Sequence, residues 1–127
     1  AGISIAVGSN SITISSPDSG ISWSGIAGTT QSAAVNSGYI VQNASQTTIT
    51  LPATCAIGDT VSVRGLGAAG WRVTANTGQT IKYVSATTTS AGSLTSTSQY
   101  DTIDVTCIVA NLVWSVFSSA TSGLTIS

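Results

Sequence analysis

The chain has 127 residues, of which three are basic and four are acidic, and it contains no histidine and no glutamate. This length fits one domain, and three scattered cations exclude both a surface for nucleic acid phosphates and a polybasic patch for membranes. Serine and threonine supply about a third of the residues while 42% are apolar, so we expect a folded domain rather than a disordered chain.

The first 25 residues predict a short β-ribbon. Isoleucine alternates with small or polar residues over residues 3–6 and 11–15, with turn chemistry at residues 7–10 between them. Residues 21–23 would add a third short strand. Two strands alone are marginally stable in water, although three ribbons could cover one another in a homotrimer. We therefore predict a β-ribbon or shaft segment at residues 1–25 and a head domain at residues 26–127.

The head begins with residues 26–38, which show no clear pattern, and then becomes regular. Short runs that alternate apolar and polar residues predict strands at residues 39–42, 47–51, 59–64 and 71–75. Pro52 ends the second of these strands because proline cannot donate a hydrogen bond to a central ladder.

The last quarter of the chain predicts the most regular strands. Over residues 102–109 the odd positions form an apolar row that faces a core, and the even positions from Thr102 to Thr106 face outward. A turn at Ala110 and Asn111 leads to strands at residues 112–117 and 123–126. About ten short strands with frequent turns predict an all-β fold, a β-sandwich or jelly-roll-like head with hairpins and Greek-key connections. We expect no membrane insertion, because no apolar run is long enough to cross a bilayer.

Residues Gly65 to Gly70 match the glycine pattern of a dinucleotide-binding turn. That pattern binds a pyrophosphate only where a strand leads into a helix. Here the strand at residues 59–64 is present, but Trp71 and Val73 begin another strand rather than a helix. The acidic residue expected about twenty positions later is also missing. We therefore interpret the glycine run as a connection between two strands and expect no cofactor.

Few groups are suited to catalysis. Without histidine or glutamate a serine has no ordinary base, and Lys82 is the single lysine. Cys107 falls in the apolar row of its strand, which favours a buried residue over a nucleophile. Asp101 and Asp104 lie on opposite faces of one strand. We expect no enzymatic activity and no metal site, although a trimer could gather three copies of one aspartate on its axis.

From residue 51 onward, weak motifs follow one another in a recognisable order and spacing. They are Leu51-Pro52, Gly58-Asp59, Gly70-Trp71, residues 75–81, 92–97 and 101–107, Asn111, residues 114–116 and residues 123–126. This series resembles a small β-rich head or tip domain of fibre-like proteins, namely bacterial trimeric surface adhesins, including mosaic adhesive trimers, and phage tail fibres. The resemblance covers about residues 21–127. It implies a homotrimeric tip that binds a cell-surface ligand, often a glycan, but it carries no binding residues over to this chain.

Aromatic residues with polar neighbours are the candidates for sugar binding, because sugars pair flat apolar faces with hydrogen-bonding groups. Trp71 follows the glycine turn and could be exposed at one end of the sandwich. We predict a shallow glycan groove lined by Trp71, Arg72, Lys82, Tyr83, Tyr100 and Asp101. For each of these, packing or strand pairing is the alternative interpretation. Trp114 is expected in the core or in a trimer interface.

The two cysteines leave the redox state open. Cys55 and Cys107 fit one disulfide in an exported β-domain as well as they fit two buried thiols. The clear core position of Cys107, which Cys55 lacks, slightly favours two thiols. Cys55 also departs from the resemblance, which implies a small apolar residue there.

Together these features predict a homotrimeric, extracellular fibre tip on a cell surface or a virion that attaches to a cell-surface ligand, in the first place a glycan. A purely structural module that trimerises or caps a fibre is the alternative. A secreted hydrolase fragment is the third possibility.

Overall fold

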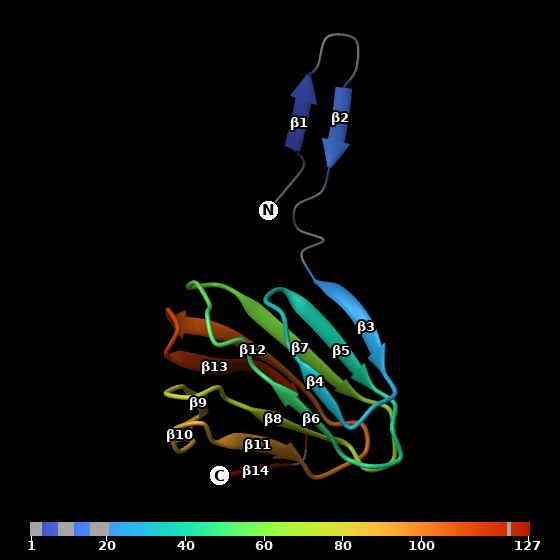
Figure 1. Cartoon of the computed structure of the whole chain (residues 1–127), viewed down its shortest axis with the longest axis vertical. Helices are drawn as coiled ribbons and strands as arrows, with labels where there is room; N and C mark the ends of the chain where they lie inside the picture. The colour runs from blue at the N-terminus through green and yellow to red at the C-terminus, as the bar shows by residue number, and fades with distance from the viewer. Residues whose placement is uncertain (1–3, 8–11, 16–20, 122) are drawn as a thin grey trace.

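The computed structural model describes residues 4–7, 12–15, 21–121 and 123–127 (Figure 1). These residues form strands and turns without any helix, as the expected all-β fold requires. Strands β1 (Ser4–Val7) and β2 (Ile12–Ser15) pair antiparallel, with Ser4 opposite Ser15 and Val7 opposite Ile12. Most of the predicted turn between them lies outside the described residues, and the assignment of residues 1–25 to a shaft stays a prediction.

The remaining strands form two sheets of mixed direction. The larger sheet has seven strands in the order β10-β9-β13-β12-β7-β5-β3. In chain order its strands are β3 (Ser22–Ile26), β5 (Ser37–Val41), β7 (Thr60–Gly65), β9 (Thr80–Tyr83), β10 (Ala86–Thr87), β12 (Thr102–Val109) and β13 (Val113–Ala120). Because β3 pairs with β5, this sheet begins at Ser22, before the predicted domain boundary at residue 26.

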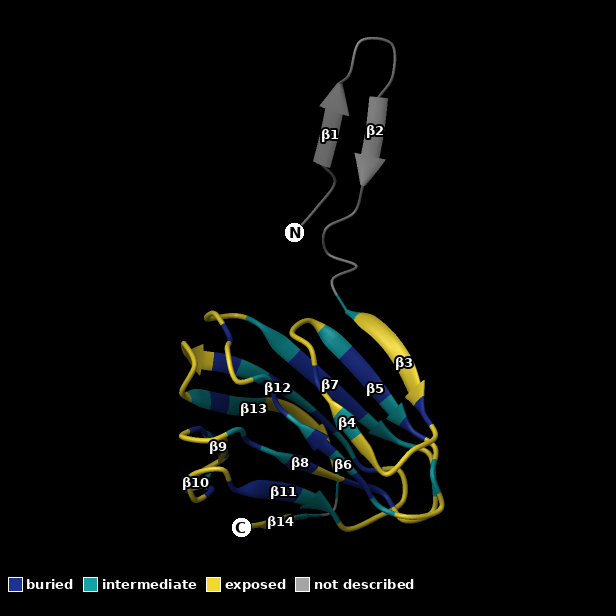
Figure 2. Ribbon diagram, in the orientation of Figure 1, coloured by how far each residue is buried: buried dark blue, intermediate teal, exposed yellow. Residues whose placement is uncertain are grey.

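The smaller sheet has five strands in the order β14-β11-β8-β6-β4. In chain order these are β4 (Thr30–Ser32), β6 (Thr47–Thr50), β8 (Trp71–Thr74), β11 (Ser93–Ser96) and β14 (Leu124–Ile126). The inward side chains of both sheets share one buried cluster, which includes Val41, Val61, Ile103 and Trp114 from the larger sheet and Ile49, Trp71, Val73 and Leu94 from the smaller one. The head is thus sandwich-like, with a core between two layers (Figure 2).

The path between the sheets differs from the predicted hairpins and Greek-key crossings. From β3 to β8 the chain alternates between the two sheets, one strand at a time. As a result β3, β5 and β7 are parallel neighbours in the larger sheet, and β4, β6 and β8 are parallel neighbours in the smaller sheet. Side chains in the loops tie successive turns together: Asn43 donates to the carbonyl of Ala27, and Thr47 donates to that of Gly28 at 2.7 Å. The expected hairpins are wrong here because each connection passes from one sheet to the other instead of turning within one sheet.

The later strands follow the predicted pattern more closely. β12 and β13 form an antiparallel hairpin around Asn111, whose φ of 62° lies in the left-handed region of a tight turn. Ile103, Val105 and Cys107 are fully buried, as the alternation predicted. Val109 is not, because an irregularity in the β12 register between Cys107 and Val109 ends the inward row.

The glycine run connects two strands, as predicted. β7 ends at Gly65 and β8 begins at Trp71, without a helix between them. A side chain at Gly67 would overlap the backbone carbonyl of Asn43, and Gly70 has a positive φ of 69°. These two positions need glycine for close packing and for chain direction, so the pattern has a structural cause.

Candidate functional site

Trp71, which was predicted to be exposed, lies in the core. Its side chain has no exposed surface, and its indole Nε1 donates a hydrogen bond of 2.9 Å to the backbone carbonyl of Asp101. The prediction is wrong because Gly70 directs the chain so that Trp71 and Val73 point inward on β8 and Arg72 points outward.

Asp101 is also buried, and its carboxylate serves the turn before β12. Its Oδ2 accepts hydrogen bonds from the backbone N–H groups of Thr97 and Ser98, at 2.8 and 2.9 Å. These bonds satisfy the charge within the fold. Trp71 and Asp101 are therefore brought together, but as structural partners and not at a surface.

The other four predicted residues do not form one groove. Arg72 lies on the outer side of the smaller sheet, opposite Thr48 and Thr95. Lys82 lies in β9 of the larger sheet, with Tyr83 beside it. Tyr100 is exposed in the turn before β12. Because the two sheets face opposite directions, one bound sugar cannot contact both Arg72 and Lys82, and a ligand role for any of the four stays a prediction.

A different aromatic residue, Trp23, is presented to solvent. Its side chain is 46% exposed although it belongs to β3, in the larger sheet. Its backbone partner in β5 is Gly38, and a Cβ atom at Gly38 would overlap the carbons of the indole ring. The ring therefore lies across β5 on the outer face of the sheet, where the missing side chain leaves room for it.

An ion pair continues this surface. The guanidinium carbon of Arg64 lies 5.2 Å from the centre of the Trp23 ring, and its Nη1 donates to Asp104 Oδ1 at 2.9 Å. The same nitrogen contacts the carbonyls of Val63 and Ile103 at 3.3 Å. The Arg64 cation is thus held against the Trp23 ring. The side chains of Arg64 and Asp104 remain 35% and 15% exposed.

These side chains belong to one region of the outer face. Trp23, Gly38, Ser62 and Asp104 follow one another across four adjacent strands, and Arg64 lies in the next outward position of β7. We call Trp23, Gly38, Ser62, Arg64 and Asp104 the indole platform. None of these five residues was among those predicted to bind a ligand. Two features of the sequence could have indicated the platform: Trp23 stands between two serines, and Gly38 lies inside a strand.

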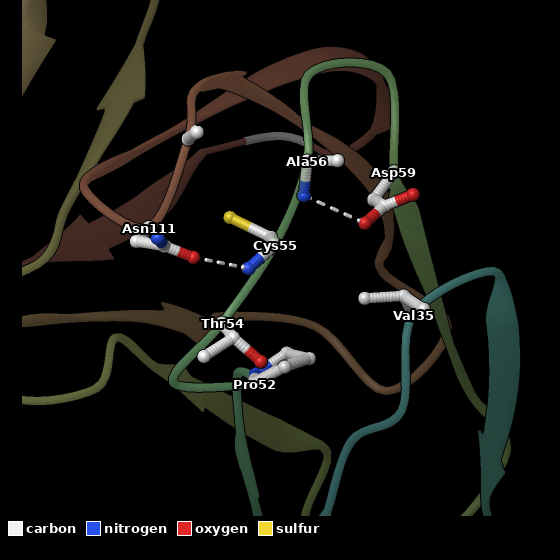
Figure 3. Close-up of a pocket in the computed structure, with 8 residues that line it drawn as sticks. Val35, Pro52, Thr54, Cys55, Ala56, Asp59 and Asn111 are labelled. Carbon is white, nitrogen blue, oxygen red and sulfur yellow. Dashed lines mark hydrogen bonds between the residues drawn. The ribbon is translucent and has the colours of Figure 1, made fainter.

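A hollow of about 480 Å³ opens at the end of the head where β12 turns into β13 (Figure 3). Its lining includes Val35, Pro52, Thr54, Cys55, Ala56, Asp59, Ala110 and Asn111. Its polar groups are used by the fold, since Asn111 Oδ1 accepts from the N–H of Cys55 and Asp59 Oδ2 accepts from that of Ala56, both at 2.8 Å. Cys55 contributes a thiol to this lining.

Cys107 lies next to Cys55, and both are buried thiols in this structure. Burial, followed by contact with the Cys55 thiol, raises the pKa of Cys107 to about 11. At neutral pH the Cys107 thiol is protonated, which is the unreactive form of cysteine. The pair therefore does not resemble an activated nucleophile.

Other kinds of site find no support in the described part of the chain. Its histidine, cysteine and acidic side chains nowhere gather in a group of three that could hold a metal ion. None of its segments forms a helix with the length and hydropathy of a membrane span. No protein-family model and no curated protein matches the sequence. Function is therefore inferred from the side chains themselves.

Proposed function

We propose that this chain is the homotrimeric tip of an extracellular fibre and attaches to a glycan on a cell surface through the indole platform. The observation that carries the proposal is Trp23, a large aromatic ring held on the outside of a sheet by a glycine beneath it and a cation beside it. In this proposal the domain binds its ligand without converting it.

The platform combines the two surfaces that a sugar ring needs. A pyranose has a face of C–H groups, which stack on an indole, and a rim of hydroxyl groups, which need donors and acceptors. Among the described residues Asp104 Oδ2 and Arg64 Nη2 have no hydrogen-bond partner, so they can accept from and donate to sugar hydroxyls. Because the ion pair already holds Arg64 in place, little side-chain entropy is lost on binding.

The charge of the platform indicates which sugars suit it. Arg64 and Asp104 neutralise each other at 2.9 Å, so neither a carboxylate nor an amine on the ligand meets an unpaired opposite charge. A neutral hexose is the expected ligand class.

Three copies of such a site would give a trimer its avidity. One shallow platform binds weakly, whereas linked sites on one particle rebind at a high effective concentration and can gain orders of magnitude in apparent affinity. A homotrimer with three outward platforms fits attachment to a surface that displays many copies of one glycan.

Two measurements test this proposal: a glycan array identifies a sugar that binds, and tryptophan fluorescence then reports whether that sugar covers Trp23. The chain has three tryptophans, and Trp71 and Trp114 are fully buried, so quenching by acrylamide reports chiefly on Trp23. A bound sugar should protect Trp23 from acrylamide, and Trp23→Ala should weaken array binding at least about tenfold. Phe117→Ala, which removes another exposed aromatic side chain from the larger sheet, is the control and should bind normally.

Two results would contradict the proposal. If the double variant Trp23→Ala/Arg64→Ala binds the array as strongly as the wild type, the glycan binds at a site other than the indole platform. Protection of Trp23 by trimer formation alone, with no binding on the array, would favour the structural module that trimerises or caps a fibre. A monomer in light scattering at micromolar concentration would count against both functions.

A further inference from the structure

The backbone holds the two cysteines beside each other. Gly58 N–H donates to the carbonyl of Cys107 at 2.9 Å, and Cys107 N–H donates to that of Asp59 at 2.8 Å. On the other side, Asn111 N–H donates to the carbonyl of Cys55 at 3.1 Å and its Oδ1 accepts from Cys55 N–H at 2.8 Å. The loop after β6 is thus fixed to both ends of the segment that contains Cys107.

The two thiols differ in access. Cys107 has no exposed surface and its Sγ lies 3.3 Å from the carbonyl oxygen of Val109, to which it donates. The Cys55 thiol is near enough to Cys107 to raise the pKa of that thiol, and its side chain lines the hollow. A small reagent that enters the hollow therefore meets Cys55 first and has no direct path to Cys107.

We propose that Cys55 and Cys107 form an oxidation site that closes into an intramolecular disulfide when a small disulfide, such as oxidised glutathione, enters the hollow. The Cys55 thiolate attacks the oxidant, forms a mixed disulfide and releases one thiol. The Cys107 thiolate then attacks the Cys55 sulfur, forms the Cys55–Cys107 bond and releases the second thiol. The protein loses two protons and two electrons, and the oxidant is reduced to two thiols.

Closure would join the loop after β6 to the end of β12. The bond encloses residues 55–107, a long loop, and a bond of this kind stabilises mainly by restricting the unfolded chain. Oxidised protein should therefore unfold at a temperature higher by about 5 °C or more. This inference is independent of glycan binding.

The second step should depend on pH. Burial is the largest cause that raises the pKa of Cys107 to about 11 in the reduced protein, and it persists in the mixed disulfide, where the Cys55 thiol is gone. Below that pH the thiolate fraction of Cys107 rises tenfold per pH unit. Closure of the preformed mixed disulfide should accelerate accordingly as the pH rises.

The test treats the reduced full chain with oxidised glutathione and follows intact mass, free thiols after denaturation and the melting temperature. The expected result is a loss of two hydrogen atoms, no free thiol and a higher melting temperature. Cys107→Ala should stop at a glutathione adduct on Cys55, whereas Cys55→Ala should remain unmodified while folded. If Cys107→Ala fails to fold, Cys107→Val replaces it in the same experiment.

Three outcomes would overturn the proposal. These are a stable glutathione adduct on the wild-type chain, crosslinks between copies in place of an internal bond, and no reaction of the folded chain at concentrations that modify the unfolded chain.

Discussion

The outer face of the smaller sheet is an ordinary polar exterior, whereas the outer face of the larger sheet carries the indole platform that we propose as a binding surface. On the smaller sheet the outward positions are nearly all hydroxyl residues. One register row crosses all five of its strands and consists of Thr30, Thr48, Arg72, Thr95 and Thr125. Threonine suits an exposed strand and can bind water, so this face needs no ligand to explain its composition.

The larger sheet has the same alternation but a different content. Its comparable row contains Trp23, Gly38, Ser62 and Asp104. The Trp23 ring packs over Gly38 and supplies the contact that the glycine lacks, but 46% of the residue remains exposed. The row on the smaller sheet has no exposed aromatic ring of this kind, so it is the control for the proposed role of Trp23.

Removing the Trp23 ring should give the largest difference in glycan affinity between substitutions on the two faces. Trp23→Ala should weaken binding of the best glycan at least about tenfold, because roughly half of a large aromatic side chain remains available to a ligand and its burial is worth ~1.5 kcal/mol. The unfolding free energy should also fall, by ~1.5 kcal/mol, because the half of the side chain that packs over Gly38 and beside Arg64 is lost as well. Calorimetric titration and urea unfolding measure the two effects. Arg72→Ala, on the opposite face, should leave the affinity unchanged, and an equal loss in both variants would remove the distinction.

Filling the space beneath the ring should give the next largest effect. Gly38→Ala places a methyl group where the indole lies, so the ring must move, and the affinity should fall about fivefold, ~1 kcal/mol. Acrylamide quenching of Trp23 should increase in the same variant. Thr48→Val on the smaller sheet is the matched change. If Gly38→Ala binds like the wild type, the position of the ring is irrelevant to recognition.

Removing the charge of Arg64 should have a smaller effect on glycan affinity. Arg64→Gln removes the charge beside Trp23 and leaves Asp104 unpaired, so we expect a loss of about threefold, ~0.6 kcal/mol. The same substitution at Arg72 tests whether any surface arginine contributes. Titration of both variants with one glycan decides the question, and equal losses would mean that Arg64 acts only through net charge.

Salt should have the smallest effect. Because Arg64 and Asp104 are paired and a neutral sugar carries no charge, the affinity should change less than about twofold between about 0.05 and 0.5 M salt. A steep decrease would instead indicate a charged ligand that uses exposed cations such as Arg72 and Lys82.

The sequence was informative about strands and less so about their partners. Alternation placed the strands at residues 59–64 and 102–109 and the buried row from Ile103 to Cys107, because a period of two is a local property of the chain. The parallel pairing of β3, β5 and β7 depends on the path of the connecting loops, which alternation does not encode.

The same limit applies to the site. Trp71 is in phase with Val73, which could have indicated an inward ring, but its position after a glycine turn suggested exposure. The contact between Trp23 and Gly38 joins residues of different strands, and so does the contact between Cys55 and Cys107. Such contacts follow from strand register, and register is set by the whole fold.

The alternating path of β3 to β8 also sets the order in which the head can assemble. Each strand of this part pairs with the strand two places earlier, so successive turns can form as they leave the ribosome, first residues first. β9 is different, because its neighbours are β10 and β13 and β13 begins only at Val113. The ribosome must therefore pass β13 before the seven-stranded sheet can close, and a chain stopped before Val113 would leave β9 without its main partner.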